Sequence, residues 1–228
     1  MFFCSKYKGF IYLLLITTSF LMVSCFDVVE EIDLKSNGSG RIKAIVNLSK
    51  SKTKVASLMK LGQIDGVKIP SEKELRTEVN KVSSVLKNTK GISNVHTTLD
   101  FTNYIGIISC DFTDISALNE FTKALSAQFK TSVSDYSRYS YNVNTKTFTR
   151  TAKSNTSDKK KLEKWTSDNK ESIKDAFYTS IYKFDNSVLS QNNKQSKVSS
   201  NKKAVMFKSS IIDIINSKVD LSNTVKLN

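Results

Sequence analysis

Apolar and polar residues alternate near the start of the chain. Apolar residues occupy the even positions from Ile42 to Leu48, and polar residues occupy most of the odd ones. This period of two is typical of a half-buried β-strand. A second extended stretch runs from Val28 to Lys35, and the turn signal Asn37-Gly38-Ser39-Gly40 lies between the two. We therefore predict a hairpin of strands 28–35 and 41–48.

Two helical patterns follow. The first covers about Lys52 to Leu61 and ends at Gly62, a residue common after helix C-termini. The second begins at Pro70-Ser71, where Ser71 and Glu74 have the spacing of a capping box. Its apolar residues recur every three or four positions and predict one buried stripe, made of Leu75, Val79, Val82 and Leu86.

The rest of the chain mixes short strands with helices. Extended patterns cover 92–101, 104–112, 139–143, 147–151 and 177–184, and the chain ends with stretches at 204–210, 211–217 (helical) and 223–227. A helix that Thr113 or Asp114 can cap has one apolar face, made of Ile115, Leu118, Phe121 or Thr122, Leu125 and Phe129. A further helix is expected around Leu162, Trp165 and Ile173. Hairpins mixed with helices favour an α+β fold, with an antiparallel sheet built from hairpins and helices packed on one side.

The first 25 residues have the order of a secretory signal peptide. After Lys6 and Lys8, an apolar run extends from Phe10 to Val23, shorter than the roughly 20 residues of a membrane-spanning helix. Leu21-Met22-Val23-Ser24-Cys25 then resembles the lipobox of bacterial lipoproteins, although Met22 stands where leucine is usual. The resemblance implies that a signal peptidase recognises Leu21, Met22, Val23 and Ser24. It also implies that the Cys25 sulfur accepts a diacylglyceryl group.

These features predict the organisation of the chain. Residues 1–24 form a lipoprotein signal peptide, and residues 25–228 form a lipid-anchored α+β domain with a polar, Lys-rich connection near 152–161. Several acyl chains, such as palmitate, would hold Cys25 in the membrane. Only Phe26 and Asp27 separate Cys25 from the first predicted strand, so we expect the folded body to lie against its membrane. Ordinary secretion and an uncleaved anchor are the alternatives.

The order of these features resembles LppM-like envelope lipoproteins and uncharacterised lipoproteins of Bacteroidota. A lipobox cysteine is followed by a strand, a glycine-containing hairpin, helices and a late block, which comprises Tyr182-Lys183-Phe184, Val188, Val198, 201–207 and 223–227. The resemblance spans most of the mature chain and implies a shared lipid-anchored α+β domain. It carries over no catalytic signature, and the Lys-rich segment 153–174 departs from the pattern.

Charge and cysteine content narrow the choice of partners. The formal net charge of the whole chain is +14. Removal of the signal peptide takes away Lys6 and Lys8 and so lowers the charge by two. Lysines are scattered along the chain, apart from the run Lys159-Lys160-Lys161. This distribution favours a solvated basic surface, and contact with anionic lipid headgroups is the alternative. We expect no nucleic-acid partner.

The cysteines predict no disulfide in the mature chain. Cys4 leaves with the signal peptide and Cys25 takes lipid, so Cys110 has no disulfide partner, and its apolar surroundings predict burial.

Candidate catalytic residues are few. His96 is the single histidine, so a histidine-based triad or multi-histidine metal site within one chain is excluded, and its strand pattern predicts an exposed polar face. Among the acidic residues of the first strand, Glu31 and Asp33 share one face and Glu30 points to the other. We predict no catalytic residue, cofactor or metal site.

We therefore expect a non-enzymatic, membrane-anchored lipoprotein of the cell envelope that acts as a binding or assembly module. Its partner would be an envelope protein, lipid or glycan. A carrier of an apolar ligand such as lipid is the first alternative, and a hydrolase that uses Glu30, Glu31 or Asp33 is the second. No lysine-acidic cluster follows Cys25, so a signal for export to the cell surface is not evident and we expect the body to face the periplasm. We expect the membrane to be the outer membrane.

Overall fold

The computed structural model describes residues 26–64, 67–129, 137–152 and 170–228. The predicted signal peptide, Cys25 and nearly all of the predicted connection at 152–161 lie outside these ranges. So do Leu162 and Trp165 of the predicted helix, whereas its third residue, Ile173, is described and helical.

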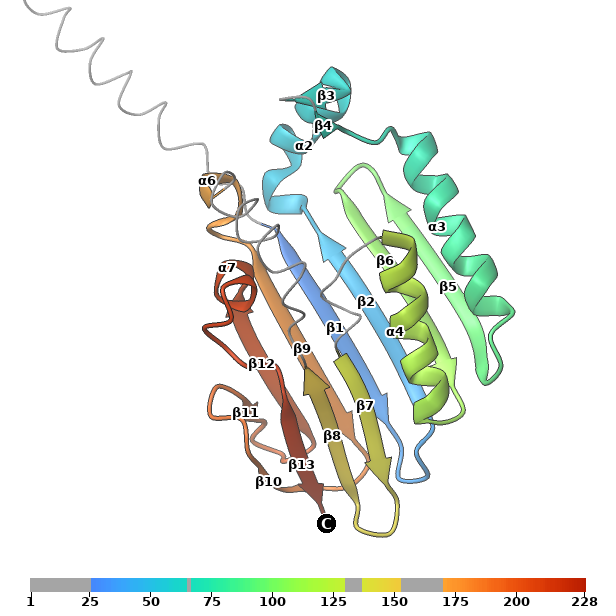
Figure 1. The fold of residues 1–228 in the computed structure, drawn as a ribbon, viewed down its shortest axis with the longest axis vertical. Helices are drawn as coiled ribbons and strands as arrows, with labels where there is room; N and C mark the ends of the chain where they lie inside the picture. The colour runs from blue at the N-terminus through green and yellow to red at the C-terminus, as the bar shows by residue number, and fades with distance from the viewer. Residues whose placement is uncertain (1–25, 65–66, 130–136, 153–169) are drawn as a thin grey trace, which may run out of the picture.

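Two sheets form the body of the domain (Figure 1). The seven-stranded sheet has the order β11 (Lys197–Val198), β12 (Ala204–Ser210), β9 (Phe177–Phe184), β1 (Asp27–Leu34), β2 (Gly40–Asn47), β6 (Ile105–Phe112) and β5 (Ile92–Asp100). The four-stranded sheet has the order β10 (Val188–Gln191), β13 (Asn223–Leu227), β8 (Thr147–Ala152) and β7 (Ser137–Asn142). A short ribbon pairs β3 (Gln63–Ile64) with β4 (Val67–Lys68).

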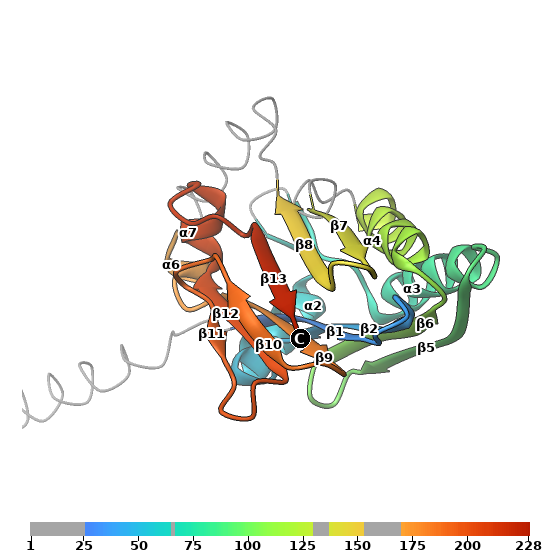
Figure 2. The same cartoon turned by 90° about the horizontal axis from the view of Figure 1, so that it is seen from below.

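The described helices connect these strands. They are a short 3-10 turn η2 (Ser49–Ser51), α2 (Lys52–Leu61), α3 (Glu72–Lys87), α4 (Ile115–Phe129), α6 (Lys170–Ile173) and α7 (Ile211–Ile215). Figure 2 shows α3, α4 and the four-stranded sheet on the same side of the seven-stranded sheet. The predicted α+β class, with antiparallel hairpins and helices packed on one side, is confirmed.

Local sequence signals account for several element boundaries. The Ser71 hydroxyl accepts a hydrogen bond from Glu74 N, and the Glu74 carboxylate accepts one from Ser71 N, as the predicted capping box requires. Gly62 ends α2 in the left-handed conformation at φ +71°. Gly38 has φ +87° in the β1–β2 turn, which a residue with a Cβ adopts at a cost. These boundaries depend on short-range contacts and were predictable.

Long-range pairing differs from a simple series of hairpins. β1 pairs antiparallel with β2 on one side but parallel with β9 on the other, where Ile32 lies opposite Tyr182. The polar stretch 186–203, for which no strand was predicted, contains β10 and β11. The β3–β4 ribbon was not predicted either.

The hydrophobic core lies between the seven-stranded sheet and the layer on its inner side. It joins Ile32 and Ile42 of the large sheet to Val82 and Leu86 of α3, and the same cluster includes Phe148 of β8. Each of these side chains is at most 1% exposed. Three of the four residues of the stripe predicted for α3 are buried, namely Val79, Val82 and Leu86. Burial of apolar surface stabilises a fold by about 25 cal/mol per Å². This shared cluster is therefore the main contribution that holds the two layers together.

Asn119 of α4 fixes the edge of the four-stranded sheet. Its side-chain amide donates to the Tyr139 carbonyl at 3.0 Å, and its Oδ1 accepts from Tyr139 N at 2.8 Å. The amide thus takes the place of a neighbouring strand at β7, where unpaired backbone groups would otherwise be costly.

Candidate functional site

The predicted lipidation site adjoins the start of the central strand. Leu21, Met22, Val23, Ser24 and Cys25 lie outside the described residues. Phe26, the first described residue, already belongs to the sheet, because its carbonyl accepts a hydrogen bond from Phe177 N at 3.0 Å. The chain therefore has no free linker between Phe26 and the folded body.

Several elements meet at this end of the seven-stranded sheet, which we call the anchor end (Figure 1). They include the first residues of β1 and β9, the last residues of β2 and β12, the β5–β6 turn, η2, α2 and the β3–β4 ribbon. Lys50 bridges to Asp27 at 3.1 Å, and Leu48 N donates to the Tyr104 carbonyl at 2.9 Å. These contacts tie the chain that enters α2 to the start of β1 and to the β5–β6 turn.

The outer face of the seven-stranded sheet is the side opposite α3, α4 and the four-stranded sheet. Its centre is apolar, since Val29 pairs with Ile45 and Ile45 with Ile107. These three side chains are half-buried, whereas inner-face residues such as Ile32 and Ile42 are at most 1% exposed. An apolar centre that keeps partial contact with solvent is a feature of protein-binding surfaces.

A row of alternating charges crosses this outer face next to the apolar centre. In strand register, Lys183 lies beside Asp33, Asp33 beside Arg41, and Arg41 beside Asp111. The Arg41 guanidinium contacts Asp111 at 2.6 Å and 3.2 Å, and Lys183 pairs with Glu31 and with Asp33. The hydrogen bonds from Arg41 and Asn94 lower the pKa of Asp111, and Asp111 in turn raises the pKa of Arg41.

An open pocket of about 590 Å³ lies along this row, at the end of the sheet away from the anchor end. Side chains of both signs line it, including Asp33, Arg41, Asp111, Lys183 and Asp185. Most of these charges already pair with one another, so the pocket offers alternating polar contacts rather than a single strong charge. This suits a polar, mixed-charge partner surface better than a simple anion or cation.

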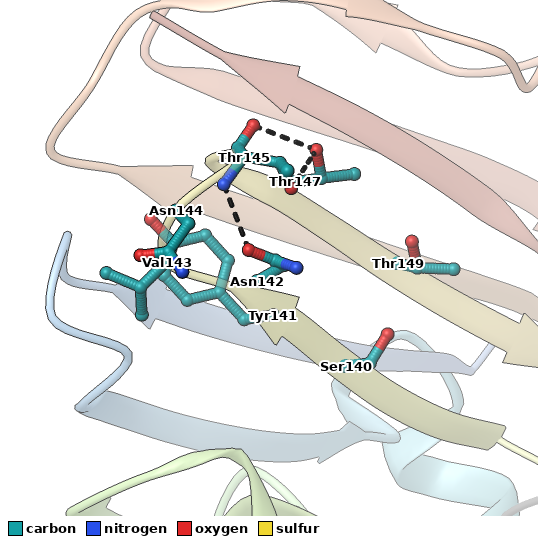
Figure 3. A pocket seen from close by; sticks show the side chains of 8 residues that line it. All are labelled: Ser140, Tyr141, Asn142, Val143, Asn144, Thr145, Thr147 and Thr149. Atoms are coloured by element: carbon teal, nitrogen blue, oxygen red, sulfur yellow. Dashed lines mark hydrogen bonds between the residues drawn. The ribbon is translucent and has the colours of Figure 1, made fainter.

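A second open pocket, of about 540 Å³, lies on the β7–β8 hairpin (Figure 3). Hydroxyl and amide groups line it, from Ser140, Asn142, Thr147 and Thr149 among others. Part of this polarity is used inside the turn, where Thr145 N donates to Asn142 Oδ1 at 2.9 Å. The lining groups can form hydrogen bonds with a ligand, but they include no charged residue.

The acidic residues of β1 are divided between the two faces as predicted. Glu31 and Asp33 lie on the outer face with Lys183, whereas the Glu30 carboxylate faces inward and accepts a hydrogen bond from the Tyr139 hydroxyl at 2.6 Å. Glu30 is therefore separated from the other two carboxylates, while Glu31 and Asp33 share one face and one lysine partner. The structure gives each a charged or hydrogen-bonding neighbour.

Glu30 belongs to a buried polar cluster that the sequence reasoning missed. Arg150, which is 3% exposed, lies 3.8 Å from Glu30 and donates to the Tyr182 hydroxyl at 2.8 Å. Its guanidinium also lies 5.4 Å from the ring centre of Tyr178. Among the described residues, the buried Tyr178 hydroxyl has no hydrogen-bond partner. The pattern Thr147-Phe148-Thr149-Arg150 could have revealed this cluster, because it places Arg150 on the same strand face as Phe148.

Burial determines the protonation of this cluster. It raises the pKa of the Tyr139 hydroxyl well above its ordinary value, so this group stays protonated and donates to Glu30. Burial lowers the pKa of Arg150, but the surrounding tyrosines and Glu30 raise it, and the net direction is upward. The cluster is thus a structural ion pair between the layers.

The remaining candidate residues occupy the predicted environments. His96 is exposed on the edge strand β5. Cys110 is 1% exposed, and burial raises the pKa of its thiol to about 12. Within the described ranges, no group of three or more histidine, cysteine or acidic residues is placed to hold a metal ion. In the same ranges, no helix is long and apolar enough to cross a membrane.

Comparisons with known proteins give one structural match. No family model matches the chain, and no curated protein matches it. Among solved structures, the chain is similar to the folded domain of the LppM protein of Mycobacterium tuberculosis, determined by NMR. The match has a TM-score of 0.48 and 12% sequence identity, and it covers 90% of each chain.

Proposed function

We propose that this protein is a non-enzymatic lipoprotein of the cell envelope, held at its membrane through acylated Cys25. The observation that carries the proposal is the direct continuation from the lipobox-like residues 21–25 into the sheet, with Phe26 already hydrogen-bonded to β9. A body joined so closely to a lipid anchor stays at the membrane surface. It therefore meets partners in the same compartment.

The division of the β1 carboxylates supports a binding role over a hydrolytic one. A general acid and a general base must face the same substrate, whereas Glu30 points to the opposite face from Glu31 and Asp33. Glu31 and Asp33 share the outer face, but both pair with Lys183. Glu30 is also held between Tyr139 and Arg150 in the core. Hydrolase activity is the alternative that this arrangement favours least.

Replacement of Cys25 by serine tests the anchor. We expect the Cys25→Ser chain to lose palmitate labelling and to move from the membrane fraction to the soluble fraction. The matched control is Cys110→Ala, which removes the other thiol of the mature chain and should keep both label and membrane association. Unchanged labelling and fractionation of Cys25→Ser would refute the proposal.

Cell fractionation tests the compartment. We propose that the anchored protein lies in the outer membrane and faces the periplasm. It should co-sediment with outer membranes and be degraded by protease only after the cells are opened. Degradation in intact cells would show that the body faces the outside of the cell. Co-sedimentation with inner membranes would show that the anchor lies in the inner membrane.

We propose the outer face as the surface that binds an envelope protein. Its apolar centre beside charges of both signs provides the contacts of a protein interface. A photo-crosslinking residue at Ile45 should give a discrete adduct in cells, and one at Leu189, which is 60% exposed on β10, should not. Equal adducts from both positions would argue against a specific face. A lipid or glycan adduct at Ile45 would show that the partner of this face is a lipid or a glycan and not a protein.

A further inference from the structure

We propose that the α2 segment, residues 49–64, lies on the anionic headgroups of the membrane that holds Cys25. This inference rests on the proposed lipid anchor and adds to it a second, reversible contact. The contact would fix which end of the domain faces the lipid.

Position is the first argument. The α2 segment belongs to the anchor end, where Lys50 bridges to Asp27 only two residues after Cys25. The β7–β8 turn lies at the opposite end, because Tyr141 of that hairpin donates from its hydroxyl to the Ser36 carbonyl in the β1–β2 turn. A body tethered through Phe26 therefore presents the α2 segment, rather than the β7–β8 turn, to the bilayer.

The packing of α2 is the second argument. None of its ten residues is buried, in contrast to α3, which buries three. Its apolar residues Val55, Leu58 and Met59 share one side at helical spacing and are half-buried, and Leu61 at its C-terminal end is 67% exposed. A helix of this kind gains little from the core and retains apolar surface that a lipid interface can cover.

Charge is the third argument and defines the ligand. Residues 49–64 include Lys50, Lys52, Lys54 and Lys60 and no acidic residue. Lys52 and Lys60 are exposed on the helix. Lysines beside a partly exposed apolar stripe match a surface of lipid phosphates over an acyl layer, and each lysine near an anionic membrane strengthens binding by about five-fold.

A fluorescent probe on the full-length lipidated protein tests this orientation. In the mature chain Cys25 is acylated and Cys110 is buried, so Leu61→Cys introduces an accessible thiol for an environment-sensitive dye. Leu189→Cys is the matched control, since Leu189 is similarly exposed at 60% and lies on β10 beside the C-terminus. In vesicles of phosphatidylethanolamine and phosphatidylglycerol, we expect blue-shifted emission and quenching by spin-labelled lipids at position 61 and not at 189.

Charge reversal separates headgroup binding from mere proximity. Lys52→Glu with Lys60→Glu should reduce the quenching at position 61 to the level of the 189 probe. The control is Lys90→Glu with Lys146→Glu, which changes the net charge by the same amount at exposed positions away from the anchor end. It should leave the quenching at position 61 unchanged. Phosphatidylcholine vesicles should give weaker quenching than the anionic ones.

The outcomes distinguish the two proposals. If the protein floats with vesicles but position 61 is quenched no more than position 189, the α2 contact is wrong and the anchor stands. If quenching at position 61 is the same in phosphatidylcholine or after reversal of Lys52 and Lys60, recognition of anionic headgroups is wrong. If the full-length protein without these substitutions does not float with the vesicles, both the anchor and the α2 contact are wrong.

Discussion

Replacement of Glu30 by glutamine tests the buried cluster that links the two layers. The glutamine side chain keeps an oxygen that can accept from the Tyr139 hydroxyl but removes the charge that lies 3.8 Å from Arg150. Since Arg150 is 3% exposed, water cannot replace the lost carboxylate. Removing one partner of a buried ion pair typically costs about 3–5 kcal/mol, and the retained acceptor places the expected loss near the lower value, about 3 kcal/mol.

The adjacent residue provides the matched control. Glu31 points to the outer face and pairs with Lys183, whose side chain is 48% exposed. Exposed pairs contribute little, so Glu31→Gln should change the free energy of unfolding by less than about 1 kcal/mol. The same substitution at two neighbouring positions should thus give clearly different results.

Urea unfolding of both variants measures this difference, through the shift of the midpoint at an unchanged m-value. Adding Arg150→Met to Glu30→Gln should cost less than the sum of the two single changes, since it removes the buried positive charge that the Glu30 carboxylate neutralises. An equal, small loss for Glu30→Gln and Glu31→Gln would refute the buried ion pair. A larger loss for Glu31→Gln would refute the assignment of the two strand faces.

The remaining predictions concern single residues in well-defined surroundings. Cys110 should resist maleimide labelling at neutral pH in the native protein and react after unfolding in urea, because its buried thiol has a pKa of about 12; rapid native labelling would contradict this. Asn119→Ala should lower the free energy of unfolding by about 1–3 kcal/mol, since it leaves the buried Tyr139 backbone groups unpaired; hydrogen exchange at Tyr139 should speed up as well. Ser71→Ala should cost about 1 kcal/mol through loss of the capping box, measured by thermal unfolding, and a neutral result would mean that α3 does not depend on this cap. Because the folded-state pKa of Asp111 is lowered from 3.8, its contribution is present above that pH and is lost as the pH falls through the folded value, so Asp111→Asn should flatten the acid side of the stability profile.

The sequence determined the local elements because their signals are local. A period of two defined β2, and the stripe of Val79, Val82 and Leu86 defined the inward face of α3. Ser71 and Gly62 marked helix ends through contacts within a few residues. The opposite directions of Glu30 and Glu31 followed from strand geometry alone.

The tertiary structure decided what these faces meet. Strand periodicity states that one side of β1 is buried, but it does not state that β9, far along the chain, pairs with β1 in parallel. It also leaves open that Arg150 lies opposite Glu30 and that Asn119 satisfies the edge of β7. These contacts join residues distant in sequence, and they are selected by the combined packing of both layers, in which a buried polar group is stable only where a partner happens to be placed.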